Sequence, residues 1–287
     1  MTVIVHVIGA SGRSGQALIR ALLADGIQVV PVVRTPAKWQ ASGIALPARQ
    51  ADLRIPETIA AALVDATTVV SCAHARYAAA ILQAAPTADR FVFLGSTRKF
   101  TRWPDAHGNG VLAGEAALMA SGRPGVMLHP TMIYGAQGED NVQRLAALLR
   151  RTPVLPLPGG GRFLVQPIYQ GDVTRAIQAA LAHKWTAPQS LVIAGPTQVT
   201  YGDFVRAVAT AAGLRCPWIL PFPAGPLIAA TRLTRHVSAL PRIEPAEVRR
   251  LLEDKAFEIG DMRTLLSIDP IPLSKGLELT FGREQYQ

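Results

Sequence analysis

"VIVHVIGASGRSGQALIRALL", residues 3–23, decides the fold. The apolar run 3–8 is followed at once by three glycines spaced three residues apart, Gly9, Gly12 and Gly15, and then by apolar residues at helical spacing. Glycines between a strand and a helix allow a tight turn, close approach of the backbone to a pyrophosphate, and packing of the helix on the sheet. The spacing is G-x-x-G-x-x-G instead of G-x-G-x-x-G, so a purely structural turn remains an alternative to a nucleotide site.

Short apolar runs alternate with helical patterns along most of the chain. The predicted strands are 3–8, 28–34, 44–53, 67–73, 90–96, 125–130 and 190–195, and the predicted helices are 13–24, 56–64, 76–85 and 111–121, with one more starting near Thr200. This alternation predicts an α/β fold, a Rossmann-type doubly wound parallel sheet with helices on both faces. We expect an NAD(P)-binding domain over residues 1–200, with a loop excursion at about 131–163, and a smaller, mainly helical lobe over 201–287.

Composition narrows the class of protein. The 287 residues are 49% hydrophobic and 17% charged, which is typical of a folded globular chain. The net charge is +9, but the cationic residues are scattered and aromatic residues make up only 6%, which argues against nucleic-acid binding. The charge suits anionic small molecules or an anionic membrane surface.

The cysteines and the apolar stretches bear on location. Cys72 and Cys216 lie far apart and form no metal-spaced pair, so we expect no metal site, no disulfide framework and a reducing compartment. The chain opens on a strand-like run, and no apolar stretch reaches the roughly 20 residues of a membrane span. We expect a cytoplasmic protein, with attachment at a membrane surface left open.

The residues after the second and third predicted strands bear on the cofactor. A site for unphosphorylated ribose usually has a carboxylate at the end of the second strand, whereas Arg34 stands there and suits a 2′-phosphate. Arg34, together with Arg13 in the glycine turn, predicts that NADP is bound in preference to NAD. The alternative is that Arg34 is an ordinary solvated strand end. Asp52, after the third strand, could accept a hydrogen bond from the adenine amino group or cap the following turn.

Taken together, "GASGRSG", "VVR", "ADL", "VVSCA", "FVFLGST", "HPTMIYG", "QPIYQGDV" and "LLSIDPIPLSKGLE" resemble the short-chain dehydrogenase/reductase superfamily, in its extended and atypical branches. Their order and spacing match over nearly the whole chain. "GGGRFLVQPIYQGDV" and "VIAGPTQVTYGDF" are most similar to the family of the complex I 39-kDa subunit, and NmrA-like sensor proteins share a glycine turn that contains an arginine.

The resemblance implies cofactor contacts. The pyrophosphate would lie on Gly9, Ser11, Gly12, Arg13, Ser14 and Gly15. The adenosine half would contact Arg34, Asp52 and Leu53, and the nicotinamide half would contact Cys72, Ala73, Ser96, Pro130 and Thr131.

The resemblance also shows what is missing. Catalytic members use a Tyr-x-x-x-Lys pair for proton transfer, and a Ser or Thr after the fifth strand orients the substrate oxygen. Thr97 matches the hydroxyl, and Glu115 matches a glutamate that commonly follows the lysine by four residues. Counting back from Glu115 puts Val111 in the place of the lysine and His107 in the place of the tyrosine. No lysine of this chain has a tyrosine four residues before it.

Several residues therefore remain candidates for the proton donor. His107, in a predicted Gly-rich loop, has a suitable reference pKa, and Lys99 could act as the acid, as in isoflavone-reductase-like relatives. Tyr134 could reach the nicotinamide cleft. The leading hypothesis is hydride transfer between NADP and a small carbonyl or alcohol substrate; the alternative is a non-catalytic dinucleotide-binding accessory or redox-sensor protein.

Two further segments bear on partners. The predicted loop 95–110 carries Arg98, Lys99 and Arg102 beside Trp103, and could accept an acidic or phosphorylated ligand or simply be solvated. The segment 218–236, which ends in Arg232, Arg235 and His236, could be a lid, a dimer face or a membrane-surface segment. A protein or membrane partner and the oligomeric state stay open.

Overall fold

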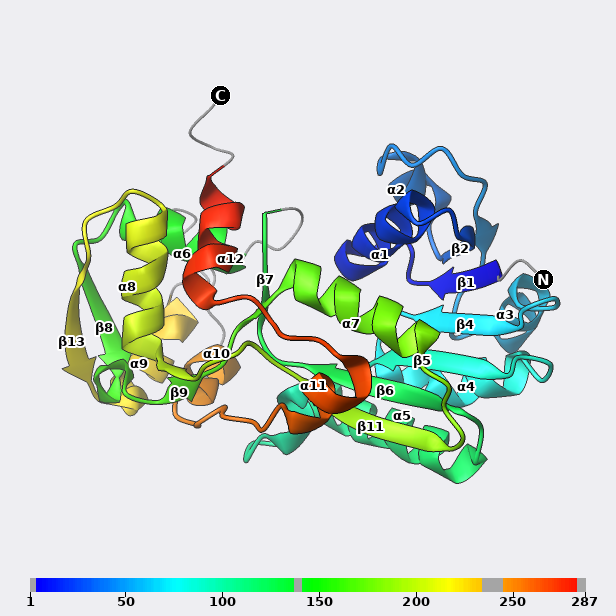
Figure 1. Cartoon of the computed structure of the whole chain (residues 1–287). Coiled ribbons are helices and arrows are strands. Elements are labelled where there is room, and N and C mark those ends of the chain that lie inside the picture. The colour runs from blue at the N-terminus through cyan, green and yellow to red at the C-terminus, as the bar shows by residue number, and fades with distance from the viewer. Residues whose placement is uncertain (1–3, 137–140, 234–244, 283–287) are drawn as a thin grey trace.

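The computed structural model describes residues 4–136, 141–233 and 245–282 (Figure 1). Its centre is a seven-stranded sheet with the strand order β11-β6-β5-β4-β1-β2-β3, in which every pairing is parallel. The strands are β1 (Ile4–Ile8), β2 (Gln28–Val33), β3 (Arg49–Gln50), β4 (Thr68–Ser71), β5 (Arg90–Leu94), β6 (Gly125–Pro130) and β11 (Pro188–Ile193). The predicted doubly wound parallel sheet is confirmed, and its order reverses between β1 and β4, where such sheets bind ligands.

Helices cover both faces of the sheet (Figure 1). On one face, α1 (Arg13–Ala24), α7 (Gln170–Ala182) and α11 (Gly260–Leu266) bury residues such as Leu18, Ile177 and Met262 in one core cluster with Val5 of β1 and Leu191 of β11. The other face is covered by α3 (Pro56–Ala62), α4 (Ala78–Ala84) and α5 (Ala106–Ser121). The 3.6-residue spacing of apolar residues in α1 is what presents one stripe to the sheet.

One predicted boundary is wrong. The helix expected over 111–121 begins at Ala106, so His107 lies in its first turn and not in a loop. Asp105 is the reason, because its carboxylate accepts a hydrogen bond from the Gly108 amide at 2.8 Å and caps the helix. The glycines here serve close packing: a Cβ on Gly114 would lie 2.0 Å from the Ala75 carbonyl oxygen.

The loop predicted over 95–110 also contains regular structure, because η2 (Thr97–Phe100) forms a 3₁₀ turn. A second such turn, η1 (Ala75–Tyr77), leads from β4 into α4. Both turns contact the start of α5, so three separate chain segments meet at the carboxyl end of the sheet.

The smaller lobe draws on two parts of the chain. Its elements are β7 (Ile133–Tyr134), α6 (Asn141–Leu149), β8 (Val154–Pro158), η3 (Gly159–Gly161), β9 (Leu164–Val165), β10 (Ile168–Tyr169), β12 (Val199–Thr200), α8 (Tyr201–Ala211), β13 (Trp218–Phe222), α9 (Ala224–Leu233), α10 (Pro245–Arg250) and α12 (Leu273–Phe281). The expected excursion 131–163 therefore contains regular structure and packs with later segments: Val142 of α6 shares a core cluster with Phe204 of α8 and Leu277 of α12.

Within the described ranges, no helix has both the length and the apolar character needed to cross a membrane. The stretch expected as one apolar segment, 218–236, divides into β13 and α9. Arg235 and His236, which belong to that prediction, lie outside the described residues, and the side chain of Arg232 is likewise not described.

Candidate functional site

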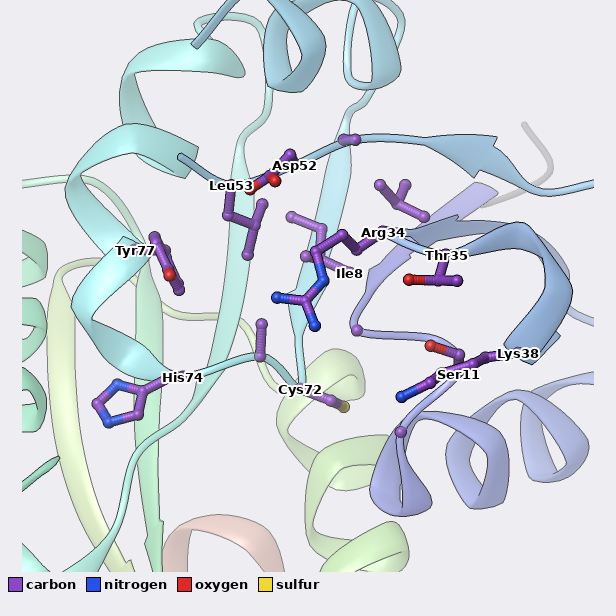
Figure 2. A pocket seen from close by; sticks show the side chains of 15 residues that line it. Ile8, Ser11, Arg34, Thr35, Lys38, Asp52, Leu53, Cys72, His74 and Tyr77 are labelled. Atoms are coloured by element: carbon purple, nitrogen blue, oxygen red, sulfur yellow. The ribbon is translucent and has the colours of Figure 1, made fainter. Parts of the chain in front are cut away.

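Two adjoining cavities lie at the carboxyl ends of the strands. The larger, of about 390 Å³, is lined from the segments after β1, β2, β3 and β4 (Figure 2). The smaller, of about 270 Å³, lies beyond it toward η1 and α5. Both are lined by Cys72, Ala73 and His74, so they form one continuous site of the size that small-molecule ligands occupy.

The glycine turn lies beneath the larger cavity. Gly9 has φ +75°, and a Cβ there would lie 2.9 Å from the Ala73 amide nitrogen. A Cβ on Gly15 would lie 2.4 Å from the Gly9 carbonyl oxygen, so both positions require glycine for the turn itself. Gly12 differs, because it is exposed and lines the cavity, and its added Cβ would approach only the Gly9 oxygen, at 3.1 Å.

The start of α1 faces the same cavity. Gly12 is the N-cap residue, and no side chain caps the helix there. The first amide groups of such a helix need partners from outside, and an anion is the natural one. Ser11 lines this cavity as well, whereas Ser14 lines the smaller one and contacts Gln170 through its hydroxyl at 3.4 Å. Arg13 is the exposed first residue of α1 and lines neither cavity.

Two cations line the larger cavity. Arg34 follows β2, and Lys38 lies four residues later in the short helix α2 (Pro36–Gln40). Figure 2 shows the Arg34 guanidinium reaching into the cavity and the Lys38 amine beside Ser11. In the described part of the chain, the charged end of neither side chain takes part in a hydrogen bond or an ion pair. Thr35, between these two residues in the sequence, also lines the cavity. Lys38 and Thr35 were not among the predicted contacts.

Asp52 and Leu53 line the opposite wall. The Asp52 carboxylate accepts a hydrogen bond from Arg54 Nε at 2.9 Å, and this partner lowers the pKa of Asp52 to about 2. The carboxylate also accepts a hydrogen bond from the Arg54 backbone amide at 3.0 Å, as a cap of the turn that follows β3 would, whereas α3 begins after Ile55 and has no side-chain cap. The Asp52 carboxylate is thus an ionised, arginine-paired group at the cavity edge.

The smaller cavity is mostly apolar. Its lining is Ser14, Cys72, Ala73, His74, Ala75, Leu94, Gly95, His107, Val111, Pro130 and Ile133. Among the residues that the structure describes, it has no Asp, Glu, Lys or Arg in its wall, and two imidazoles are its main polar groups. Burial raises the pKa of the Cys72 thiol to about 12, so this thiol stays protonated and unreactive.

His74 and His107 meet edge to face in this wall, with ring centroids 4.4 Å apart. Burial lowers the pKa of His107, and nearby Arg98 lowers it further; burial and His107 lower the pKa of His74 to about 4. Both rings are therefore neutral at pH 7. Val111, one turn after His107, is 1% exposed and also lines the cavity, so these two residues face it from one side of α5.

The other predicted catalytic residues lie elsewhere. The Lys99 amine donates to both oxygens of Glu115 at 2.6 Å and lies 3.4 Å from His129 Nε2. Tyr134 is buried, its hydroxyl donates to the Leu273 carbonyl at 3.4 Å, and burial raises its pKa. Neither residue lines a cavity.

Of the residues predicted to contact ligands near β5 and β6, Pro130 lines the smaller cavity, whereas three hydroxyl-bearing residues do not. Thr97 donates from its hydroxyl to the carbonyl of Pro130 at 3.2 Å, and Pro130 lines the smaller cavity. The Ser96 hydroxyl caps η2 by accepting from the Arg98 amide at 3.1 Å. The buried Thr131 hydroxyl donates to the Gln166 carbonyl at 2.5 Å. Thr97, Ser96 and Thr131 therefore lie behind the wall and not in it.

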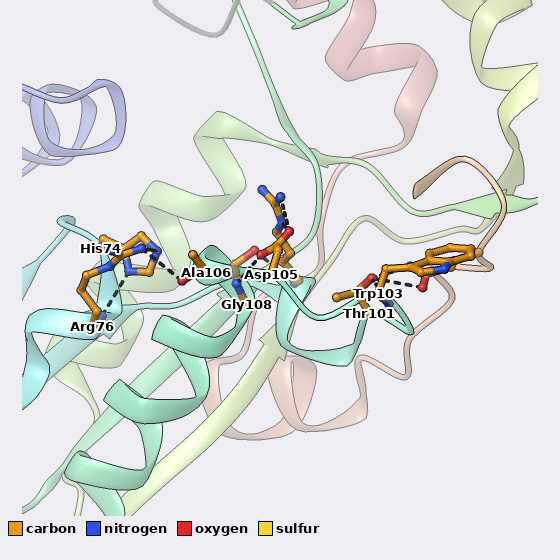
Figure 3. A network of polar contacts seen from close by, with 10 residues as sticks. His74, Arg76, Thr101, Trp103, Asp105, Ala106 and Gly108 are labelled. Atoms are coloured by element: carbon orange, nitrogen blue, oxygen red, sulfur yellow. Dashed lines mark hydrogen bonds and ion pairs between the residues drawn. The ribbon is translucent and has the colours of Figure 1, made fainter. Parts of the chain in front are cut away.

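Two of the three cations expected to hold an acidic ligand, Arg98 and Lys99, are engaged within the protein. Figure 3 shows the polar network around Asp105, with Thr101 and Trp103 nearby. Arg98 donates from Nε to the Asp105 carboxylate at 2.7 Å, and Lys99 is paired with Glu115. The backbone of Arg102 is held by the buried Glu253, which also accepts from the Thr101 hydroxyl. Across the described ranges, no three His, Cys, Asp or Glu side chains gather as a metal site would require.

Residues 9–121 match a family model described as NAD(P)H-binding. An uncharacterized protein of Mycobacterium tuberculosis is 28% identical over 212 residues, which are 73% of this chain and 23% of that protein. The chain thus spans about a quarter of the length of the curated relatives it matches.

Solved structures with the same fold include UDP-glucuronic acid 4-epimerase from Bacillus cereus, in complex with UDP-glucuronic acid and NAD. Its TM-score is 0.73 at 18% identity, over 99% of this chain and 100% of that chain. A short-chain dehydrogenase/reductase superfamily protein from Agrobacterium tumefaciens with bound NAD has a TM-score of 0.73 at 15% identity, over 98% and 97% of the two chains. At these identities, the likeness establishes the fold.

Proposed function

We propose that this chain is an NAD(P)-binding protein of the short-chain dehydrogenase/reductase type, which binds NADP(H) and transfers hydride between the cofactor and an alcohol or carbonyl carbon. The observation that carries the proposal is the presence of two cations, Arg34 and Lys38, in the larger cavity beside the glycine turn, whose charged ends have no hydrogen bond or ion pair within the described ranges. NAD is the alternative cofactor.

The preference for NADP follows from charge. A 2′-phosphate needs cations that are free to bind it, and a guanidinium fork with an ammonium and the Thr35 and Ser11 hydroxyls would supply both charge and hydrogen bonds. A ribose diol would instead need a free carboxylate, and Asp52, an acid in this wall, is already paired with Arg54.

The remaining cofactor contacts follow from the two cavities. Gly9, Gly12 and Ser11 would hold the pyrophosphate against the start of α1. Leu53 and Asp52 would adjoin the adenine, and Ser14, Cys72, Ala73 and Pro130 would adjoin the nicotinamide. When bound, the cofactor would accept or supply a hydride at nicotinamide C4.

His107 is our candidate for the proton. Its lowered pKa means that the neutral ring predominates at pH 7, and a neutral imidazole can accept a proton but is a poor donor. In alcohol oxidation, His107 would take the hydroxyl proton as the hydride leaves the carbon, and it would pass that proton to water. In the reverse direction it must first be protonated, so the rate of reduction should fall as the pH rises above the pKa of His107.

The apolar wall supports a substrate that is uncharged near its reacting carbon. Leu94, Val111 and Ile133 suit hydrocarbon, and two of the three cations predicted to hold an acid, Arg98 and Lys99, are paired internally. We therefore replace the acidic or phosphorylated ligand with a small neutral alcohol or carbonyl compound.

Nucleotide affinity tests the cofactor assignment. The double variant R34Q/K38Q should weaken NADPH binding about 100-fold and leave NADH binding within about twofold, measured by nicotinamide fluorescence titration, because each charge-assisted bond contributes about 1.5–3 kcal/mol. The matched control is K275Q, which removes an exposed cation on α12 far along the chain. An equal loss for both nucleotides would overturn the phosphate contact.

Turnover tests the chemistry. NADP⁺ with a panel of short primary and secondary alcohols, followed at 340 nm, should give activity that H107F removes while NADPH affinity is kept. The kcat/KM of the wild type should rise with pH to a plateau, with its midpoint below about 6.5, because the His107 pKa is lowered. The second candidate, a dinucleotide-binding protein without turnover, is favoured by Val111 in the place of a lysine; inactivity on every alcohol and aldehyde would establish it.

A further inference from the structure

The strands β8 and β13 form a two-stranded parallel ribbon with one face in the core and one in solvent. Figure 1 places this ribbon at the outer end of the smaller lobe, away from β1 and α1. Leu155 and Leu157 of β8, with Ile219 of β13, pack into a core cluster with Val205 of α8. Side chains alternate along a strand, so the neighbouring residues point outward.

The outward face is apolar. Val154 pairs with Trp218 and Pro156 with Leu220, and Phe222 continues the face opposite Pro158, which is itself buried. The exposed large residues are Val154 at 40%, Trp218 at 77%, Leu220 at 49% and Phe222 at 41%. A contiguous strip that includes a tryptophan so fully exposed is unusual for a free surface and marks an interaction site.

The sequence around each strand of the ribbon carries charge of one sign. Both strands lie in acid-free sequence, since no Asp or Glu occurs over 141–171 or over 204–243. Arg151 and Arg215 each precede the first strand residue by three positions, so they flank the same end of the ribbon. Both are exposed, and in the described part of the chain their guanidinium groups have no ion pair. At the other end, Arg162 lies over the Phe163 ring.

We propose that this face binds an anionic phospholipid bilayer. Trp218, Leu220 and Phe222 would enter the boundary between headgroups and acyl chains, where tryptophan is enriched, and Arg151 and Arg215 would lie on the lipid phosphates. The attachment is peripheral and uses a strand face. It is independent of the proposed hydride transfer, because the ribbon shares no residue with either cavity.

The same charges disfavour a second copy of the chain as the occupant. A two-fold interface would place this patch against itself, and the acid-free segments would bring arginines together with no carboxylate of either strand to offset them. A bilayer rich in acidic lipid supplies the missing negative charge and also accepts the apolar side chains.

Vesicle sedimentation tests the proposal. The full chain is mixed with vesicles of phosphatidylcholine alone and of phosphatidylcholine with enough phosphatidylglycerol to give a negative surface potential. We expect binding to the acidic vesicles that falls as salt rises. The variant W218S/F222S should lower the partition coefficient at least tenfold, and R151Q/R215Q should lower it about tenfold. V64S, at a residue 73% exposed in another part of the chain, is the matched control and should bind as the wild type does.

The thermal unfolding midpoint of each variant shows that it is folded, and size-exclusion chromatography gives its oligomeric state. Failure of the wild type to bind acidic vesicles would overturn the proposal. So would equal binding of W218S/F222S and the wild type, or a wild-type dimer that W218S/F222S converts to a monomer, because the strip would then be a protein interface.

Discussion

Lys99 donates hydrogen bonds from its amine to both carboxylate oxygens of Glu115 at 2.6 Å, and so joins η2 to α5 behind the smaller cavity. The side chains are only 9% and 17% exposed. The Ser190 hydroxyl donates to the same carboxylate at 2.5 Å, and His129 lies against Ser190 at 3.1 Å. This cluster connects α5, the helix that carries His107 in its first turn, to β6 and β11.

The E115Q variant should therefore be strongly destabilised. Removing one partner of a buried pair leaves the other charge uncompensated, at a cost of about 3 kcal/mol. Urea unfolding at pH 7.5 measures the loss. The double variant K99M/E115L, which removes both charges, should recover part of it; a double variant less stable than E115Q would show that the pair is not the main contribution.

Acid should weaken the same cluster through His129, which is fully buried. Burial, with the nearby Lys99 amine, lowers the pKa of His129 to about 4. Because the folded pKa lies below the unfolded value of about 6.5, the unfolded chain binds the proton first as pH falls. Stability should thus decline between pH 6.5 and 4, by about 2 kcal/mol at pH 5. Urea midpoints of the wild type and H129N across this range measure it, and a wild-type decline that persists undiminished in H129N would assign the effect to other groups.

The sheet could be predicted from sequence because parallel strands buried on both faces are short apolar runs, such as 67–73 and 125–130. The start of α5 could not. The H-G-N-G stretch has the composition of a loop, and only the contact of Gly114 with the Ala75 backbone explains glycines inside this helix. Glycine in sequence does not distinguish a turn from a close approach of two segments.

Sequence can predict those site residues that directly follow a strand, as Arg34 does. Lys38 comes four residues later, and Pro36 is the sequence signal for the short helix α2 that carries it. His74 was missed because an isolated histidine carries no pattern. The pairing of Lys99 with Glu115 joins residues 16 apart across two elements, so no local spacing could reveal that the lysine is engaged.

The glycines of the turn should separate folding from binding. G15A places a Cβ 2.4 Å from the Gly9 carbonyl oxygen, so the turn must distort and the protein should lose several kcal/mol of stability or fail to fold. G12A meets only a 3.1 Å contact and should fold with nearly wild-type stability. Because its methyl group would occupy the surface meant for the pyrophosphate, NADPH affinity should fall about tenfold or more. Thermal unfolding and nicotinamide fluorescence measure the two effects, and unchanged affinity in G12A would place the pyrophosphate elsewhere.

Asp105 should influence the site in two separable ways. Its carboxylate caps α5 at the Gly108 amide, 2.8 Å away, and pairs with Arg98. D105A removes both and should cost about 1–2 kcal/mol, whereas D105N keeps a capping oxygen and should cost less. The charge also raises the pKa of His107, against burial and Arg98, which lower it. Both variants should therefore lower that pKa further, since each removes the negative charge and leaves Arg98 in place.

Proton NMR titration of the His107 ring, with urea unfolding on the same samples, separates the two roles of Asp105. An equal fall of the pKa in D105A and D105N, with unequal loss of stability, is the expected result. A His107 pKa that moves in D105A but not in D105N would mean that the helix end had shifted, so that the cap and not the charge sets the ionisation of the ring.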